Sequence, residues 1–376
     1  MSAAPDTGRA VIVDLPHGPA DDPQDRAGLA ALAARHLMDP RAGGPGTLAR
    51  ARVWHTRHQL APHCSSFAFW SGLDDDLAEV GTAFALAVPP GADRLRELVA
   101  AQLRLATAYR DDPYTRLLDL LEATATGAPD RPALGTEQSL AAIGPQDVRA
   151  YLAANCGDRA VTHRSAGDDA PAPAPGAVRQ PRPRHWRGGR RTVPLPGAVV
   201  RVALALPVDP PAPGALELAV ELLGSHGLGG RLARALRGER PLAYGLGAFR
   251  LGGPDGRGTA ALAVQAQVAP DHAREALHLL RETVHSVLSG PVPEAERRDA
   301  SARLRTALLS QVDQPFGAVD ERRRRLRGEP ELTALAAAVG ERALDGLLPS
   351  VAPGLTPATV ALGAVPEDFL ESGTWA

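Results

Sequence analysis

The chain has 376 residues, of which 44% are hydrophobic and only 4% aromatic, so aliphatic side chains must fill its cores. This length favours two domains over one. The formal net charge is −2, and the sequence contains no lysine; such a balance argues against nucleic-acid binding, because phosphate binding requires a basic surface.

The first half alternates short strands with apolar helices. A strand is predicted at Ala10–Leu15 and an Ala- and Leu-rich helix at Gly28–Met38. A second strand is predicted at Ser65–Leu73, followed by a long amphipathic helix at Asp93–Tyr109 with an acidic residue in its first turn. A closing strand is expected near Arg159–His163.

A break in composition follows the first half. Residues 163–197 contain alternating alanine and proline and several arginines, a composition that favours an extended linker. We therefore expect a first domain at residues 1–165, a linker rich in proline and arginine at 166–197, and a second domain at 198–376.

The second half repeats the order of the first. Strands are predicted at Val199–Leu206 and Thr259–Val268, helices at Ala215–Ser225 and Pro270–Ser289, and a closing strand near Ala358–Ala364. This order predicts two homologous α+β domains, each with an antiparallel or mixed β-sheet and helices packed on one face. A repeat of this size indicates duplication rather than a short-period solenoid.

Three segments resemble one known family. Tyr109–Cys156 contains a D-D-P helix start and a P-A-L-G-T-E-Q-S-L loop, Leu222–Phe249 contains a Gly-rich loop followed by G-R-L and R-P-L-A-Y, and Pro270–Leu309 contains a V-P-E-A-E helix start. In this order they resemble the insulinase/pitrilysin zinc metallopeptidases, in the two-domain branch similar to the mitochondrial processing peptidase. The resemblance implies the LuxS/MPP-like metallopeptidase fold.

The zinc motif of that family is absent. Its first helix carries H-x-x-E-H, which supplies two imidazole ligands and a general base. The corresponding positions here include Ala31, Ala34 and Arg35, and the third ligand position falls near Leu98. His36 and Glu97 lie one place away from motif positions, but one imidazole cannot hold a catalytic zinc. The resemblance therefore implies the fold without a complete catalytic site, and no metal or other cofactor is expected in this chain.

One pair of residues in the second domain matches a functional pair of the family. Family members place an arginine and a tyrosine, seven residues apart, opposite the zinc, where they contact the substrate carbonyl. Arg237 and Tyr244 have this spacing, and their side chains are donors suited to a developing oxyanion. Because arginine is abundant in the chain, such a spacing also arises by chance, and Tyr244 could simply pack in a strand. The surrounding sequence favours the substrate-binding role.

Three other patterns were weighed for chemistry. His55, His58, His63 and Cys64 carry zinc-ligand atoms, but the segment is strand-like, so His55 and His58 should point to opposite faces. The Gly-rich segment Gly224–Gly230 lacks the Gly-Lys ending of a phosphate loop and is interpreted as a turn, with peptide gating as an alternative. The arginine run Glu321–Arg327 is interpreted as a solvated helix face, with attraction of acidic peptides as the alternative.

The cysteine content and the start of the sequence bear on the compartment. The two cysteines, Cys64 and Cys156, are far apart and match no C-x-x-C spacing. The first residues lack an apolar core typical of a signal peptide, and no run of eighteen apolar residues occurs. We expect a cytoplasmic chain with reduced thiols and no membrane span.

These observations predict a non-catalytic subunit of a heterodimeric zinc metallopeptidase. The partner would be a homologous chain with an intact H-x-x-E-H motif, which would hold the zinc. The substrates would be short unfolded peptides, including leader peptides of peptide natural products. The alternatives are a structural or peptide-binding scaffold with the same fold, and an independent hydrolase with a metal at His55, His58 and His63.

Overall fold

The computed structural model describes residues 9–52, 55–61, 63–71, 77, 79–127, 133–157, 159–164, 185–208, 214–224, 229–251, 260–289, 291–314, 316–327, 329–341 and 351–371. The chain divides into two compact units, and each takes segments from distant parts of the sequence. The first unit contains Met1–Tyr109, Arg131–Pro181 and Gln311–Gly328. The second contains Arg110–Asp130, Arg182–Ser310 and Glu329–Ala376.

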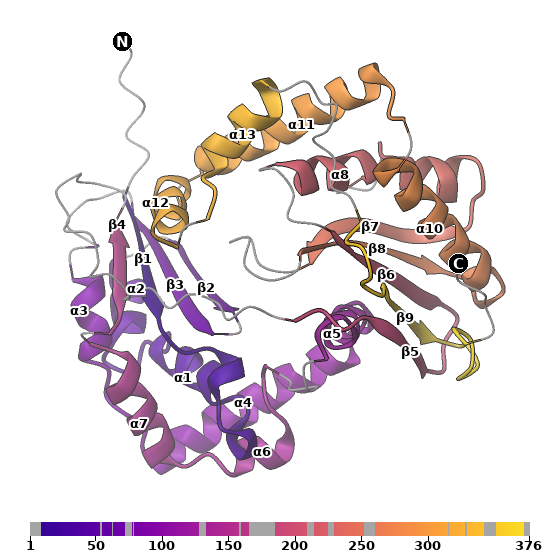
Figure 1. Cartoon of the computed structure of the whole chain (residues 1–376). Helices are drawn as coiled ribbons and strands as arrows, with labels where there is room; N and C mark the ends of the chain where they lie inside the picture. Colours follow the sequence, from indigo (N-terminus) through magenta and orange to yellow (C-terminus); the bar gives the residue numbers. More distant parts are fainter. Residues whose placement is uncertain are drawn as a thin grey trace. The chain divides into compact units, whose positions relative to one another are not determined.

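The first unit is built on an antiparallel sheet with the strand order β2-β3-β1-β4 (Figure 1). Its strands are β1 at Arg9–Leu15, β2 at His55–Ala61, β3 at Cys64–Ser71 and β4 at Val161–Arg164. Strand β1 has an aliphatic side chain at almost every position, as expected for a central strand with both faces covered.

Several helices cover one face of this sheet. The side chains of Val11, Val13 and Leu15 pack there in the main core, together with apolar residues of α1, α4 and α7. The helices and short helical turns of the unit are η1 (Pro19–Asp21), η2 (Gln24–Arg26), α1 (Leu29–Leu37), α2 (Pro45–Arg52), α3 (Val80–Ala85), α4 (Ala92–Asp111), α6 (Glu137–Ala141) and α7 (Pro145–Asn155).

A helix from the second half of the chain packs on the opposite face of this sheet. Helix α12, Gly317–Arg327, lies against β1 and β4. Val319 packs with Ile12 in a small apolar cluster. The guanidinium of Arg323 donates from Nε to Oδ2 of the buried Asp14 at 2.9 Å. The run of arginines is therefore not simply a solvated face, which corrects the sequence interpretation; one member forms a buried ion pair that attaches the helix.

The second unit has a five-stranded mixed sheet with the order β5-β9-β6-β8-β7. Strands β5 and β9 are parallel and the other neighbours are antiparallel. The strand bounds are β5 at Gly189–Pro194, β6 at Val200–Val208, β7 at Ala243–Leu251, β8 at Ala260–Val268 and β9 at Ala358–Gly363.

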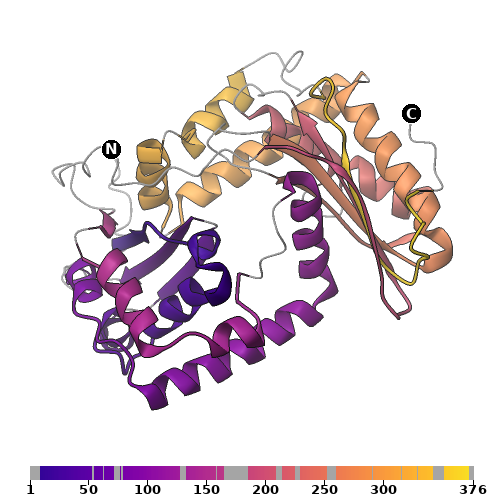
Figure 2. The ribbon, with the colours of Figure 1, turned by 60° about the horizontal axis from the view of Figure 1, so that its bottom comes forward.

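Both faces of the second sheet are also covered by helices. Helices α8 and α10 contact β6, β7 and β8 on one face, and α5, at Pro113–Thr126, lies on the other face (Figures 1 and 2). Leu117, Leu120 and Leu121 of α5 pack against small side chains of the sheet such as Ala203. The remaining elements are α8 (Ala215–Leu223), α9 (Arg231–Ala233), η4 (Arg234–Gly238), η5 (Pro270–His272), α10 (Ala273–Leu288), α11 (Glu294–Val312) and α13 (Leu332–Glu341).

The structure confirms the α+β class, with an antiparallel sheet and a mixed sheet. Helices cover both faces of each sheet and not one face as expected, because α12 and α5 pack on the second faces. Two strands, β5 and β7, were not predicted. Strand β5, Gly189–Pro194, falls inside the expected linker 166–197, where its parallel pairing with β9 and the hydrogen bond from Trp186 Nε1 to the Thr356 carbonyl oxygen (2.7 Å) tie it to the second unit. The exchange of α5 and α12 between the units was not predicted either. In the part of the chain that the structure describes, no helix combines the length and hydropathy needed to span a bilayer.

Candidate functional site

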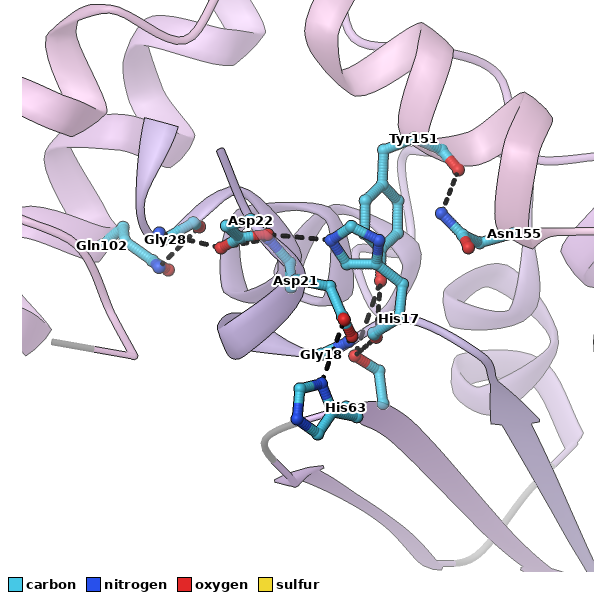
Figure 3. Close-up of polar contacts among 11 residues, drawn as sticks. His17, Gly18, Asp21, Asp22, Gly28, His63, Gln102, Tyr151 and Asn155 are labelled. Carbon is cyan, nitrogen blue, oxygen red and sulfur yellow. Dashed lines mark hydrogen bonds and ion pairs between the residues drawn. The ribbon is translucent and has the colours of Figure 1, made fainter. Parts of the chain in front are cut away.

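The N-terminus of α1 is held by a buried carboxylate. Asp22 is 4% exposed and accepts hydrogen bonds from the backbone N–H of Gly28 at 3.0 Å and of Ala30 at 3.1 Å (Figure 3). His17 Nε2 lies 3.0 Å from the same carboxylate. Gly28 has a φ of 94°, and a Cβ there would lie 2.7 Å from the Leu134 carbonyl oxygen. A glycine and a negative charge at this point favour the start of the helix.

The side chains that the resemblance aligns with the zinc motif are unsuited to a metal ion. Ala31 and Ala34 are 4% and 1% exposed, and Leu98 on α4 is 2% exposed, so all three are core residues. Arg35 donates from Nε to Oε1 of the buried Gln102 at 3.3 Å. Methyl groups and a guanidinium offer no lone pair to zinc. The residues present therefore do not fit a catalytic zinc.

His36 and Glu97, which lie one place away from the expected motif positions, contact other groups. His36 is 3% exposed and its Nε2 lies 2.7 Å from the Val88 carbonyl oxygen. Burial lowers the pKa of His36, so the neutral ring donates from Nε2. Glu97 is exposed and forms ion pairs with Arg41 and Arg94. A shift of the motif by one residue therefore does not place a carboxylate and an imidazole together.

The histidines of β2 do not converge on a metal. His55 pairs with Trp70 and His58 with Phe67 in the strand register, so they point to opposite faces, as predicted. His63 Nδ1 lies 3.0 Å from Asp21 Oδ1 (Figure 3). Among the described residues no group of three histidine, cysteine, aspartate or glutamate side chains is arranged to hold a metal. This arrangement argues against the relocated-metal hypothesis.

Arg237 and Tyr244 come together in the second unit. Arg237 lies in the π-helical turn η4 and donates from Nε to the Ala243 carbonyl oxygen at 3.2 Å and from Nη2 to the Tyr244 carbonyl oxygen at 2.6 Å. The pairing of β7 with β8 shifts between Ala243 and Gly245, so Tyr244 is the extra residue of a bulge. Its side chain is 67% exposed. The arginine thus fixes the backbone from which an exposed phenol projects.

The Gly-rich segment precedes this pair. Residues 225–228 of Gly224–Gly230 lie outside the described residues, so the gating hypothesis stays a prediction. Directly after it, Arg231 of α9 makes two hydrogen bonds to the Glu296 carboxylate, at 2.9 and 2.8 Å. This pairing, with the neighbouring arginines, lowers the pKa of Glu296. The ion pair ties the start of α9 to α11.

Two features of these regions were not found from the sequence. Gln102 on α4 faces Arg35 and also donates to the Leu134 carbonyl oxygen at 3.1 Å, so it joins α1, α4 and the loop before α6. A single buried glutamine in an amphipathic helix gives little signal in sequence. The sequence does not predict the bulge at Tyr244 either, apart from the glycine that follows it.

The chain is similar to one family model and to several solved structures. Residues 140–304 match the family model described as the peptidase M16 inactive domain. No curated protein matches the chain. The solved structures with the same fold include a peptidase M16 inactive domain from Pseudomonas fluorescens, with 17% identity, a TM-score of 0.69, and coverage of 96% of this chain and 94% of that one.

Two further structures share the fold. A chain of the complex III dimer from Candida albicans, solved with Inz-5 bound, has 16% identity and a TM-score of 0.75, covering 99% of this chain and 94% of that one. The periplasmic protease PqqL from Escherichia coli has 13% identity and a TM-score of 0.70, covering 97% of this chain and 44% of that one. The family model thus bears out the resemblance for residues 140–304, at the level of the peptidase M16 inactive domain. The branch of the family and the loss of the zinc motif stay predictions.

Proposed function

We propose that this chain is the non-catalytic subunit of a zinc peptidase of the peptidase M16 type. The zinc and the general base would come from a homologous partner chain that carries H-x-x-E-H. This chain would supply Tyr244, held in place by Arg237, to bind the substrate. The substrates would be short unfolded peptides, and leader peptides of peptide natural products are one class to test.

The observation that carries this proposal is the chemistry of α1. Ala31, Ala34 and Arg35 occupy the three motif positions without a group that can ligate zinc or accept a proton from water. The match of residues 140–304 to an inactive domain supports the same division of labour. The fold is kept, while the chemistry at the zinc position is replaced by apolar packing and an Arg35–Gln102 hydrogen bond.

Tyr244 supports a role in substrate binding because of its exposure. A tyrosine that is 67% exposed at a strand bulge contributes little to a core. Among the described residues its hydroxyl group has no hydrogen-bond partner. A phenol positioned in this way can donate to a substrate carbonyl, and donation to a developing oxyanion lowers the barrier of amide hydrolysis.

The test uses the purified chain alone and mixed with a homologous chain from the same organism that carries the intact motif. We expect co-elution of the two chains and peptide cleavage only in the mixture. Replacing Tyr244 with phenylalanine removes one hydroxyl, and we expect kcat to fall about a hundredfold while co-elution is kept. Tyr114→Phe, at an exposed tyrosine of α5 in the same unit, is the matched control and should leave kcat unchanged.

Two results would overturn the proposal. The first is chelator-sensitive peptidase activity, with stoichiometric zinc, in the isolated chain. The second is an active pair that is indifferent to Tyr244→Phe. The latter would favour a structural role, as the similarity in fold to a chain of complex III also allows. In that case co-elution would persist without any contribution of this chain to turnover.

A further inference from the structure

One face of the second sheet changes from apolar to polar along its strands. Ala203 of β6 and Ala263 of β8 pack under the leucines of α5 on this face. Because side chains two residues apart on a strand share a face, Arg201, Gln265 and Gln267 lie on the same face beyond the alanines. Arg201 is the partner of Gln267 in the β6–β8 register. The polar end of this face therefore places an arginine beside a glutamine.

The guanidinium group of Arg201 has no role in holding the fold together. The residue is partly buried, and among the described residues its side chain has neither a hydrogen-bond partner nor an ion-pair partner. Other arginines of the same unit, by contrast, are each paired with a glutamate: Arg231, Arg250 and Arg303. Partial burial removes water from the Arg201 cation, and no described protein group replaces that water. An anion from outside the chain would do so.

A carboxylate that interacts with Arg201 through the electrostatic field belongs to Asp112, the N-cap of α5. Its oxygens accept hydrogen bonds from the backbone N–H of Tyr114 and from the backbone N–H and the hydroxyl group of Thr115. This carboxylate is therefore committed to the start of its own helix. It forms no ion pair with Arg201, so it offsets part of the charge but leaves the N–H donors of the guanidinium open.

The neighbours of Arg201 in the sheet favour a bound carboxylate. On one side its partner in the register is the buried Leu362 of β9, and an apolar neighbour lowers the local dielectric constant and strengthens charge interactions. On the other side Gln267 offers a neutral amide donor, and Gly245, the partner of Gln267 on β7, has no side chain to cover that amide. None of the described strands of this sheet contains an acidic residue. A carboxylate at Arg201 would thus meet a cation and an amide without repulsion from the strands.

We infer that Arg201 binds a carboxylate group of the peptide substrate, with Gln267 donating beside it. Planar guanidinium and carboxylate groups form paired hydrogen bonds, which are stronger than bonds between neutral groups. The inference rests on the proposed function for the identity of the ligand as a peptide. It adds the substrate class, which is peptides with an acidic side chain or a free C-terminus that reaches Arg201. Arg201 would then determine specificity without taking part in bond cleavage.

The experiment measures the affinity of the full chain for three short Gly-Ser peptides by fluorescence anisotropy, with a neutral BODIPY label at the N-terminus. The first peptide has a central glutamate and an amidated C-terminus. The second has glutamine in place of the glutamate and a free C-terminal carboxylate, and the third has glutamine and an amidated C-terminus. We expect the first or the second to bind about tenfold more tightly than the third. The peptide that does so identifies the source of the carboxylate.

Substitutions at Arg201 test whether this preference depends on the guanidinium group. Arg201→Gln should abolish the preference, and Arg201→Lys should keep part of it, since an ammonium group carries the charge without the planar fork. Arg305→Gln is the matched control and should keep the full preference. It removes an exposed arginine of α11 in the same unit that also has no partner among the described residues. Asp112→Asn removes the nearby competing carboxylate and should raise the affinity for the preferred peptide about twofold.

Thermal unfolding separates binding from folding. Because the guanidinium of Arg201 bonds to no described group, Arg201→Gln should have nearly the same Tm as Arg305→Gln while the preference is lost. The inference is overturned if neither carboxylate improves binding, if no peptide binds, or if the preference survives Arg201→Gln. A lowered Tm with an equal loss of affinity for all three peptides would identify a structural arginine and would overturn it as well.

The two proposals fail in different ways. If the two-chain enzyme cleaves peptides with dependence on Tyr244 but binding does not depend on Arg201, the proposed function stands and the carboxylate site is wrong. If the carboxylate preference depends on Arg201 but no partner confers cleavage, the site stands and the chain is a peptide-binding protein. If both proposals hold, Arg201→Gln should raise KM for the preferred peptide about tenfold with kcat unchanged, whereas Tyr244→Phe should lower kcat.

Discussion

Arginine performs distinct tasks at single positions of this chain. At Arg35, which the resemblance aligns with a zinc-ligand position, it donates to Gln102. At Arg323 it neutralises the buried Asp14, and at Arg237 it bonds to two carbonyl oxygens of its own chain. These tasks use the planar set of five N–H donors, which lysine lacks. The absence of lysine is therefore compatible with dense hydrogen bonding around the candidate site.

Arg237 should act on catalysis by positioning Tyr244 rather than by contacting substrate. We expect Arg237→Met to lower kcat of the two-chain enzyme about tenfold, because the bulge loses two hydrogen bonds. Arg237→Lys should recover part of the rate, since a single ammonium reaches one carbonyl but not both in a fork. The measurement is kcat on an unstructured peptide, with binding to the partner as the check on assembly.

A double-mutant cycle separates positioning from direct contact. If Arg237 acts through Tyr244, adding Arg237→Met to Tyr244→Phe should cost less than the product of the two single effects. Independent, multiplicative losses would instead indicate that Arg237 touches the substrate. Arg240→Met, at an exposed arginine paired with Glu275 nearby, serves as the control and should change kcat by less than about twofold.

The residues of the candidate site differ in how far sequence could reveal them. The absence of the zinc motif at Ala31 and Arg35 could be predicted from the sequence, because the family pattern sets the spacing of the motif along one helix. The role of Gln102 could not be predicted, since it depends on the contact with Arg35, and that contact is set by packing between distant elements. In sequence, a buried glutamine looks like any glutamine on a solvated face.

At the scale of elements, α5 has a strong start signal. Asp112 is its N-cap, and the carboxylate accepts from the backbone N–H of Thr115 at 3.0 Å and from its hydroxyl at 2.6 Å. Pro113 at the first helical position adds to this signal. We expect Asp112→Ala to lower the free energy of unfolding of the second unit by about 1 kcal/mol in urea titrations. Asp112→Asn keeps an acceptor and should cost less.

The contribution of this cap depends on pH in a defined direction. The Thr115 hydroxyl hydrogen bond, then the backbone bonds, hold the pKa of Asp112 below its ordinary value of 3.8. The stabilisation is complete above 3.8 and is lost as the pH falls through the lowered folded-state pKa. The stability difference between the unaltered chain and Asp112→Ala should therefore shrink in strong acid to about the difference between Asp112→Asn and Asp112→Ala, because a protonated carboxyl group keeps only a neutral acceptor. A difference that does not change with pH would rule out the ionised cap as its source.

Among the elements, strands with unusual composition were the ones missed. Strand β7, Ala243–Leu251, contains Gly245 and Gly247, and glycine is depleted in strands. Strand β5, Gly189–Pro194, follows a Pro-rich segment and pairs in parallel with β9 far along the chain. Period and composition revealed the apolar strands β1, β6, β8 and β9, because their burial determines their composition. Strands β5 and β7 are only partly buried, so burial does not determine their composition and the sequence pattern does not predict them.

For the whole molecule, the exchange of α5 and α12 is the feature that no local pattern contained. The apolar stripe of α5, with Leu117, Leu120 and Leu121, predicts that the helix is buried but not on which sheet. In the structure this helix from the first half completes the core of the second unit, and α12 from the second half covers the first sheet. Neither unit is a continuous piece of chain.

This exchange predicts how fragments of the chain behave. Residues 1–165 expressed alone would carry α5 without its sheet and would lack α12. Residues 182–376 alone would lack the three leucines that fill one face of the second sheet. The loss of this apolar contact is comparable to the whole stability of a typical domain, because each buried leucine contributes about 1.5–3 kcal/mol. Each fragment should therefore be insoluble or partly folded, as judged by size-exclusion chromatography and circular dichroism.

Co-expression of the two fragments supplies the decisive comparison. Each fragment then provides the helix that the other needs, so a soluble two-piece complex should form with the circular dichroism of the intact chain. Cleaving the intact protein at a protease site inserted in residues 166–181, where none of the described elements lies, should likewise leave both pieces together. A fragment that folds alone with a cooperative thermal transition would show that the exchanged helix is dispensable. Each unit would then fold without the helix that comes from the other half of the chain, and α5 and α12 would not be required for the cores of the two sheets.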